Sequence, residues 1–115
     1  MTKRKPVVWV TQEANHNFSV AEKFGEVRFL AREDLSNIKG SLHNEKLVSH
    51  ITRNLVGFDH TMDYVVIAGS PYTAALVFLL LGNKGYKTIN ILRWDNRSFE
   101  YIPAEICLRG VQRDQ

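Results

Sequence analysis

Apolar residues along this chain gather in short runs separated by polar stretches. Runs rich in Val, Ile and aromatic residues are typical of β-strands. Strands are therefore predicted over residues 7–11, 26–31, 63–68, 88–93 and 99–108. The runs at 7–11 and 63–68 are almost wholly apolar, which is typical of central strands buried on both faces.

Three segments between these runs are predicted to be helical. Leu47, Val48, Ile51 and Leu55 share one face of an amphipathic helix over 44–56. Ser70 and Pro71 are suited to the N-cap and first position of a helix over 71–83. That helix is apolar on nearly every side, so we expect the sheet, or a partner as well, to bury it widely.

A short helix over 19–24 is predicted from a capping-box spacing. Ser19 and Glu22 are three residues apart, so that each side chain could accept from the other residue's backbone N–H. Gly25 follows where a left-handed C-cap is expected.

This alternation of strands and helices predicts the α/β class. We expect a small Rossmann-like or flavodoxin-like, mostly parallel sheet of four to five strands. Helices would cover both faces, and a C-terminal antiparallel hairpin strand would complete the sheet. The predicted spatial order is 26–31, 7–11, 63–68, 88–93 and 99–108. Pro103 lacks a backbone N–H and belongs at the sheet edge or at a bulge.

Length and composition indicate one domain over residues 1–115. A single cysteine, Cys107, fits a reducing compartment, and no apolar run is long enough to cross a bilayer. We therefore expect a soluble, cytoplasmic protein.

The net charge of +3 raises the question of nucleic-acid binding. The excess lies in two basic tails, 1–5 and 109–115, which we expect to be flexible, while the body between them is close to neutral. Basic tails alone add weak, salt-sensitive attraction to phosphate, so nucleic-acid binding is kept as an alternative function.

The carboxyl ends of the predicted parallel strands are the first candidate site. In open α/β sheets, ligands bind where the strand order reverses. Residues of this candidate anion or nucleotide rim are Thr11, Gln12, His16, Gly69, Ser70 and Tyr72. The free N–H groups of a helix N-terminus can bind an anion, although a plain strand-to-helix turn with an N-cap accounts for the same residues. The chain contains no Gly-x-Gly-x-x-Gly or Walker sequence.

Catalytic and metal chemistry have little support in the sequence. Ser70 could act as a nucleophile in a small hydrolase or transferase if His16 lay within reach, but the Gly-x-Ser-x-Gly pattern is absent. The four histidines lack metal-ligand spacing. We therefore assign no catalytic residue, metal or cofactor.

The predicted hairpin is the second candidate site. Arg93, Trp94, Phe99 and Tyr101 could form an exposed aromatic patch that anchors a protein partner. Trp94 could equally close the end of the core. The apolar helix and an open edge at 99–108 also make a homodimer plausible.

The second half of the chain resembles small, uncharacterised α/β proteins of tailed bacteriophages. The similarity covers residues 63–108: a strand, the Gly69-Ser70-Pro71 turn, an apolar helix, and an Arg93-Trp94-Asp95 and Tyr101-Ile102-Pro103 hairpin. Ser70 stands where such turns often carry an acidic residue. The resemblance implies a phage accessory protein in the cytoplasm of a bacterial host and carries over no catalytic residue.

Together these observations favour a non-catalytic binding protein that docks on a host or phage protein. The alternatives are nucleotide or nucleic-acid binding through the strand-end rim and basic tails, and a small enzyme acting at Ser70.

Overall fold

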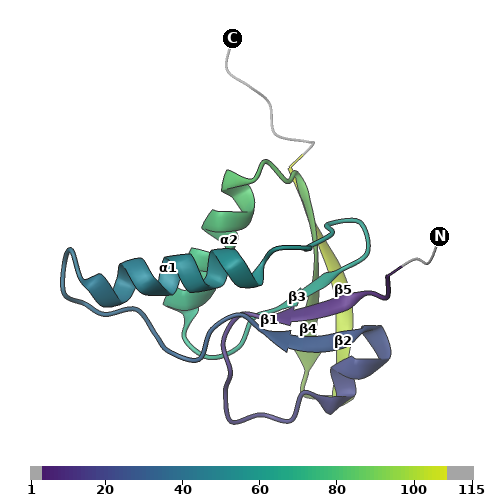
Figure 1. Cartoon of the computed structure of the whole chain (residues 1–115). Helices are drawn as coiled ribbons and strands as arrows, with labels where there is room; N and C mark the ends of the chain where they lie inside the picture. Colours follow the sequence, from purple (N-terminus) through teal and green to yellow (C-terminus); the bar gives the residue numbers. More distant parts are fainter. Residues whose placement is uncertain (1–3, 109–115) are drawn as a thin grey trace.

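The computed structural model describes residues 4–108, which form a five-stranded sheet with two α-helices and one 3₁₀-helix (Figure 1). The elements follow in the order β1 (Val7–Val10), η1 (Ser19–Phe24), β2 (Glu26–Phe29), α1 (Leu42–Asn54), β3 (Tyr64–Val66), α2 (Pro71–Asn83), β4 (Thr88–Asp95) and β5 (Glu100–Cys107).

The sheet has the strand order β2-β1-β3-β4-β5, which confirms the predicted order. All neighbouring strands are parallel except β4 and β5, which pair antiparallel as a hairpin. Pro103 lies on the edge strand β5, opposite Leu92. The chain runs outward from β1 to β2 and then returns across the sheet to β3 and β4, so the order reverses between β1 and β3.

Helices lie on both faces of the sheet, but the two faces are covered unequally. Both α-helices lie on the same face, where Leu47 and Ile51 of α1 and Val77 of α2 share a core with Trp9 and Val65 (Figure 1). The opposite face is covered by η1 and the loop before it, with a core that includes Val8, Val10, Phe18, Ala21 and Tyr101. The second layer is thin, which leaves room for surface pockets there.

The helix boundaries differ from prediction for local reasons. The capping box at Ser19 is wrong, because η1 has Phe18 at its N-cap position with no side-chain cap hydrogen bond, and the Ser19 N–H donates to Asn17. Helix α1 begins two residues before the predicted start, because the Ser41 side chain caps it by accepting from the His43 N–H at 3.1 Å.

Helix α2 is less buried than its composition predicts. Thr73, Ala74, Val77 and Leu81 are buried against the sheet and α1, yet Tyr72 and Leu79 are 69% and 70% exposed. The sheet therefore covers only one side of this apolar helix.

A buried carboxylate organises the amino ends of the strands. Asp63 is fully buried and accepts hydrogen bonds from the Val7 and Asp59 N–H groups, from the Trp9 indole and from Arg4. Asp63, directly before β3, is therefore part of the core.

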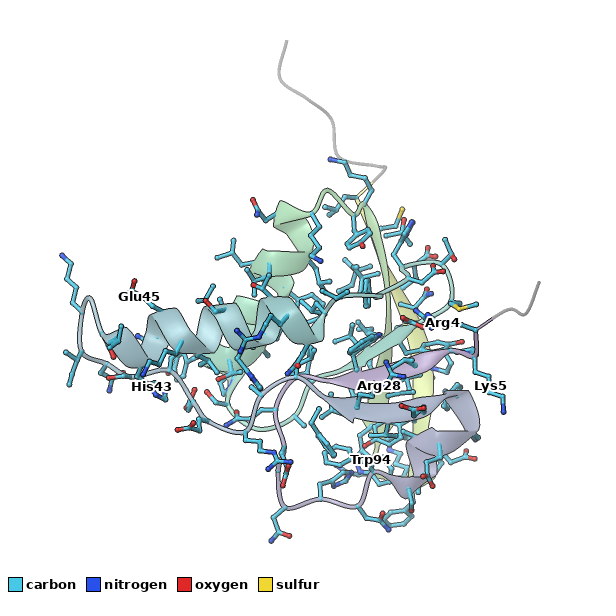
Figure 2. The ribbon with its side chains drawn as sticks, in the orientation of Figure 1. Arg4, Lys5, Arg28, His43, Glu45 and Trp94 are labelled. Carbon is cyan, nitrogen blue, oxygen red and sulfur yellow. The ribbon has the colours of Figure 1, made fainter. Side chains whose placement is uncertain are left out.

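Part of the N-terminal basic segment is attached to the domain. The Arg4 guanidinium also donates to the Gly57 carbonyl, beside the start of β1 (Figure 2). Residues 1–3 and the C-terminal tail, 109–115, lie outside the described residues. Over the range 4–108, neither α-helix combines the length and apolar character needed to cross a membrane.

Candidate binding site

The strand-end rim assembles at the reversal point between β1 and β3. Thr11 is fully buried; its hydroxyl donates to the Ala68 carbonyl at 2.9 Å and accepts from the Ala68 N–H at 3.0 Å. The Ser70 N–H donates to Gln12 Oε1 at 2.7 Å. Gly69 has a φ of 74°, and a Cβ there would lie 2.5 Å from Gln12 Oε1. Gln12 therefore lies beside Gly69 and Ser70, as predicted, and it is hydrogen-bonded to Ser70.

The N-terminus of α2 is also occupied by groups of the chain itself. The Ser70 hydroxyl caps the helix by accepting from the Tyr72 N–H at 3.1 Å, and Asp34 accepts from the Thr73 hydroxyl at 2.8 Å. Hydrogen bonds from Thr73 and Ser70 hold the pKa of Asp34 below its ordinary value. A carboxylate is favoured at a helix N-terminus, and here it would repel an anionic ligand.

His16 bonds to β5 and not to Ser70, and it packs on the face of the sheet that η1 covers. Its ring makes edge contacts with Phe18 and Trp94, at centroid distances of 4.9 and 5.2 Å. Its Nε2 lies 3.0 Å from the Tyr101 hydroxyl. Burial raises the pKa of the Tyr101 phenol, so this hydroxyl stays protonated at neutral pH. The His16 ring is thus bonded to β5 and belongs to an aromatic cluster.

A pocket of about 270 Å³ joins parts of the two candidate sites. Its wall contains His16 and Gly69 from the rim, and Trp94 and Tyr101 from the hairpin. Phe18 is a wall residue that the sequence prediction missed. The pocket is mainly apolar and aromatic, so it could receive one apolar or aromatic group.

The four residues of the predicted hairpin patch separate onto different surfaces. Tyr101 is only 3% exposed, so its expected exposure is wrong: it packs in the core of the η1 face. Arg93 pairs with Ile102 and Trp94 with Tyr101, and because successive strand residues point to opposite faces, Arg93 and Trp94 diverge.

Trp94 and Phe99 remain together near the hairpin turn. Trp94 is half-buried, lies beside the rings of Tyr101 and Phe99, and donates its indole N–H to Asn96 at 2.8 Å (Figure 2). Phe99 is 68% exposed and has a φ of 55°. A positive φ is a strained conformation for a bulky residue.

The turn that carries Phe99 is held by a carboxylate. Asp95 accepts from the Ser98 hydroxyl and from the Arg97 and Ser98 N–H groups, and these hydrogen bonds hold its pKa below the ordinary value. The Phe99 N–H donates to the Asp95 carbonyl at 2.8 Å. The turn therefore fixes Phe99 in an exposed position.

The described part of the chain contains no cluster of side chains suited to a metal ion. No group of three or more His, Cys, Asp or Glu residues between residues 4 and 108 could hold a metal ion.

The sheet order, the reversal point and the closing hairpin define a small doubly wound α/β protein with an antiparallel edge strand. Within that class, residues 6–108 match the family model described as Phage Pam3 gp32-like protein, and the chain belongs to this family. The predicted phage resemblance is thus confirmed, and the match extends well beyond residues 63–108. No curated protein and no solved structure matches the chain.

Proposed function

We propose that this phage protein is a non-catalytic binding protein that docks on another protein, of the phage or its host, through the tip of the β4–β5 hairpin. The observation that carries the proposal is Phe99, a large aromatic side chain that is 68% exposed and held at a φ of 55°. Strained backbone that persists in a fold is often found at ligand-binding positions. Exposed aromatic side chains are also frequent anchors in protein interfaces.

The neighbouring pocket supports the same surface. Trp94 contacts Phe99 on one side and contributes to the wall of the 270 Å³ pocket on the other. A partner that covers Phe99 could insert one apolar side chain into this pocket, beside His16. Such a pairing of a protruding aromatic residue and a pocket is common at interface hot spots.

The geometry at Ser70 favours binding over hydrolysis. The Ser70 hydroxyl accepts from the Tyr72 N–H as a helix cap, and the His16 ring is bonded to Tyr101. A serine nucleophile needs a base within hydrogen-bond reach. Activity at Ser70 would therefore require His16 to leave the aromatic cluster.

Capture experiments with matched surface variants test the proposal. Tagged wild-type protein, Phe99→Ser and Val56→Ser are incubated with nuclease-treated lysate of phage-infected cells, and the retained proteins are then purified and titrated. Val56 is 73% exposed in the segment after α1, so its replacement controls for loss of any exposed apolar residue. We expect to retain a partner protein that wild type and Val56→Ser bind with equal affinity. Phe99→Ser should bind the same partner at least roughly tenfold more weakly, as is usual when an interface anchor is removed. Equal binding to all three, or no bound protein, would refute docking through the hairpin.

A second copy of this chain is the second candidate partner. Leu79 of α2 is 70% exposed, and Ile102 and Ile106 of the edge strand β5 are 49% and 41% exposed. Apolar exposure of this kind on an open strand edge favours association. Light scattering over a concentration series distinguishes the two partners: a dimer that Ile106→Ser dissociates supports self-association, and a monomer at all concentrations contradicts it.

A further inference from the structure

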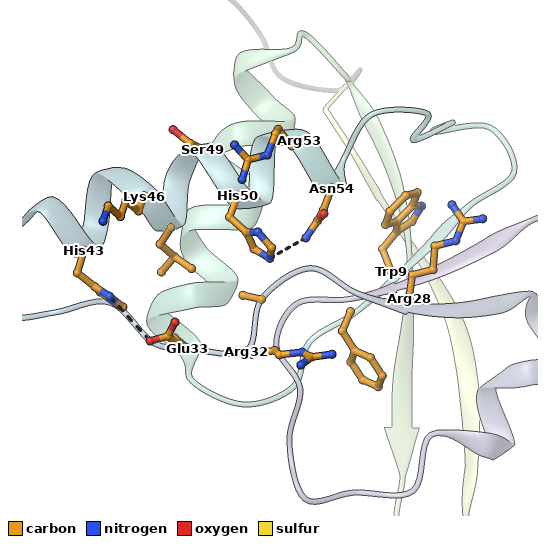
Figure 3. Close-up of a pocket in the computed structure, with 13 residues that line it drawn as sticks. Trp9, Arg28, Arg32, Glu33, His43, Lys46, Ser49, His50, Arg53 and Asn54 are labelled. Carbon is orange, nitrogen blue, oxygen red and sulfur yellow. Dashed lines mark hydrogen bonds and ion pairs between the residues drawn. The ribbon is translucent and has the colours of Figure 1, made fainter.

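A second, larger surface lies at the opposite edge of the sheet from the hairpin. A groove of about 1000 Å³ runs between α1 and the β2 edge (Figure 3). His43, Lys46, His50 and Arg53 lie along its α1 wall, and Arg28 and Arg32 lie on the wall formed by β2 and the segment after it.

The α1 wall follows from residue spacing. His43, Lys46, His50 and Arg53 are separated by three, four and three positions, which places them on one face of a helix. Leu47 and Ile51 occupy the neighbouring buried face. The same helix therefore packs on the core and presents a basic stripe to the groove.

Charge in the groove is strongly one-sided. Glu33 is the one carboxylate among its wall residues. Lys46 and Arg53 form no salt bridge with any residue between positions 4 and 108. Arg28 and Arg32 pair with Glu26 and Glu13, but all four side chains are exposed. Exposed pairs contribute about 0–1 kcal/mol, so an anionic ligand could replace either carboxylate.

Several groove residues are held in place before any ligand binds. The Arg28 guanidinium lies 5.6 Å from the centre of the Trp9 ring. The Asn54 side-chain amide donates to the Leu30 carbonyl and to His50 Nε2, each at 3.0 Å. Because Nε2 accepts, the neutral His50 ring carries its proton on Nδ1, where it can donate to a ligand.

We propose that this groove binds the phosphodiester backbone of single-stranded nucleic acid. From His43 to Arg53 the helix rises about 15 Å, at 1.5 Å per residue, so the basic groups form a line that a single phosphate could not span. Phe29 lies at the rim of the groove, but its ring packs edge-on against Phe18 at 5.4 Å on the η1 face, so it is not a stacking surface for the groove. Arg28 and Arg32 line the groove, and arginine side chains beside a basic track add cation–π contacts to unpaired bases.

This site differs from the rim at the carboxyl ends and from the tails. Asp34 occupies the N-terminus of α2, so the rim offers no free basic surface there, and Arg4, the first described residue, is paired with Asp63. The groove lies at the β2 edge, whereas the hairpin lies at the β5 edge. Loss of one binding activity can therefore be measured without loss of the other.

Fluorescence anisotropy with labelled oligo-dT tests the groove. The probe is about 20 nucleotides long, longer than a single-strand site of this size requires. We compare wild type with Lys46→Gln/Arg53→Gln and with Lys84→Gln/Lys87→Gln, which removes the same charge from exposed positions between α2 and β4. Circular dichroism confirms that each variant is folded.

We expect the groove variant to bind roughly tenfold more weakly and the control to change by less than about twofold. The slope of log K against log salt should fall by about 0.7 for each lost phosphate contact. Equal weakening of both double variants would refute the groove, since net charge alone would explain it. Three results would each overturn the assignment to single strands. Wild type does not bind oligo-dT at low salt, it binds double-stranded DNA more tightly than oligo-dT, or poly-glutamate displaces oligo-dT as well as unlabelled oligo-dT does.

Discussion

Polar side chains have different roles at the amino ends and at the carboxyl ends of the central strands. At the amino ends, Asp63 is fully buried and its two oxygens accept from Arg4, Trp9 and two backbone N–H groups. At the carboxyl ends, the Gln12 and Asp34 side chains bond to the start of α2, but Gly69 lines a pocket there and the exposed Phe99 follows the end of β4.

The polar cluster at the amino ends stabilises the fold, whereas the surface at the carboxyl ends can bind a ligand. The Asp63 carboxylate is saturated by hydrogen bonds and has no access to solvent, so this charged cluster serves the fold. The pocket at the other end has room for a ligand group. Substitutions at the two ends should therefore affect different measurements.

The largest effect is expected from Asp63→Asn. The new amide would place an N–H group among donors at one of the two oxygen positions. At the Oδ2 position this leaves the Trp9 indole and the Asp59 N–H without their acceptor, while the remaining oxygen still accepts from Arg4. Arg4 is 37% exposed and keeps water as a partner, so the cost comes from the buried donors, at about 1–3 kcal/mol for each one left without an acceptor. Urea denaturation should show a loss of this size.

Asp59→Asn provides the matched control. Asp59 is half-exposed, and its side chain bonds only to Thr61 among the described residues, so we expect a loss of under about 1 kcal/mol. If the two variants are equally stable, the carboxylate of Asp63 does not organise the amino ends.

The pH dependence of stability should show the same asymmetry. Burial alone would raise the pKa of Asp63, but hydrogen bonds from Arg4, Trp9 and the two N–H groups hold it below the ordinary value. The unfolded state therefore binds this proton first as pH falls. The stabilisation is present above the unfolded pKa of about 4 and is lost as pH falls through the folded pKa.

Denaturation between neutral and acid pH measures this dependence. Asp63→Asn should flatten the acid limb of the stability curve, because its site no longer titrates. An unchanged slope in that variant would assign the acid sensitivity to the exposed carboxylates instead.

At the carboxyl ends, Gly69→Ala is expected to cost about 2 kcal/mol. A left-handed conformation costs a non-glycine residue about 1–2 kcal/mol, and the new Cβ would also displace Gln12 from the Ser70 N–H. Thermal or urea denaturation gives the value.

Gly85→Ala isolates the second contribution. Gly85 has a φ of 88° and nothing within 4 Å of an added Cβ, so only the conformational cost of about 1–2 kcal/mol applies. Equal losses for the two variants would mean that the Gln12 contact adds no stability.

The strand order could be predicted because each strand carries its own local signal. The apolar runs at 7–11 and 63–68 identify central strands, and a central strand restricts where its neighbours can lie. The approach of Gln12 to Ser70 follows from that order, because both residues follow adjacent parallel strands. The family match agrees with the resemblance read from the Gly69-Ser70-Pro71 turn and the hairpin.

Features that depend on distant residues could not be predicted from local patterns. Burial of Asp63 depends on Arg4, which is 59 positions away. Tyr101 and Ile102 differ in exposure because the 11–18 loop covers one face of β5. The spacing of Lys46, His50 and Arg53 is visible in the sequence, but the groove requires the β2 edge beside it.

The smallest expected change in stability, and the only increase, comes from Phe99→Asn. Asparagine tolerates a positive φ better than a bulky residue does, so relief of backbone strain should stabilise the fold. Strained positions cost about 1–3 kcal/mol. The expected gain is only about 0.5 kcal/mol of this, because the contact of Phe99 with Trp94 is lost. Phe99→Ala removes the ring but not the strain and should not stabilise the protein. If Phe99→Asn is more stable and yet loses the hairpin's protein partner, stability and binding oppose each other at this residue. If it is less stable, Phe99 supports the aromatic cluster, and the carboxyl end resembles the amino end more closely than its exposure indicates.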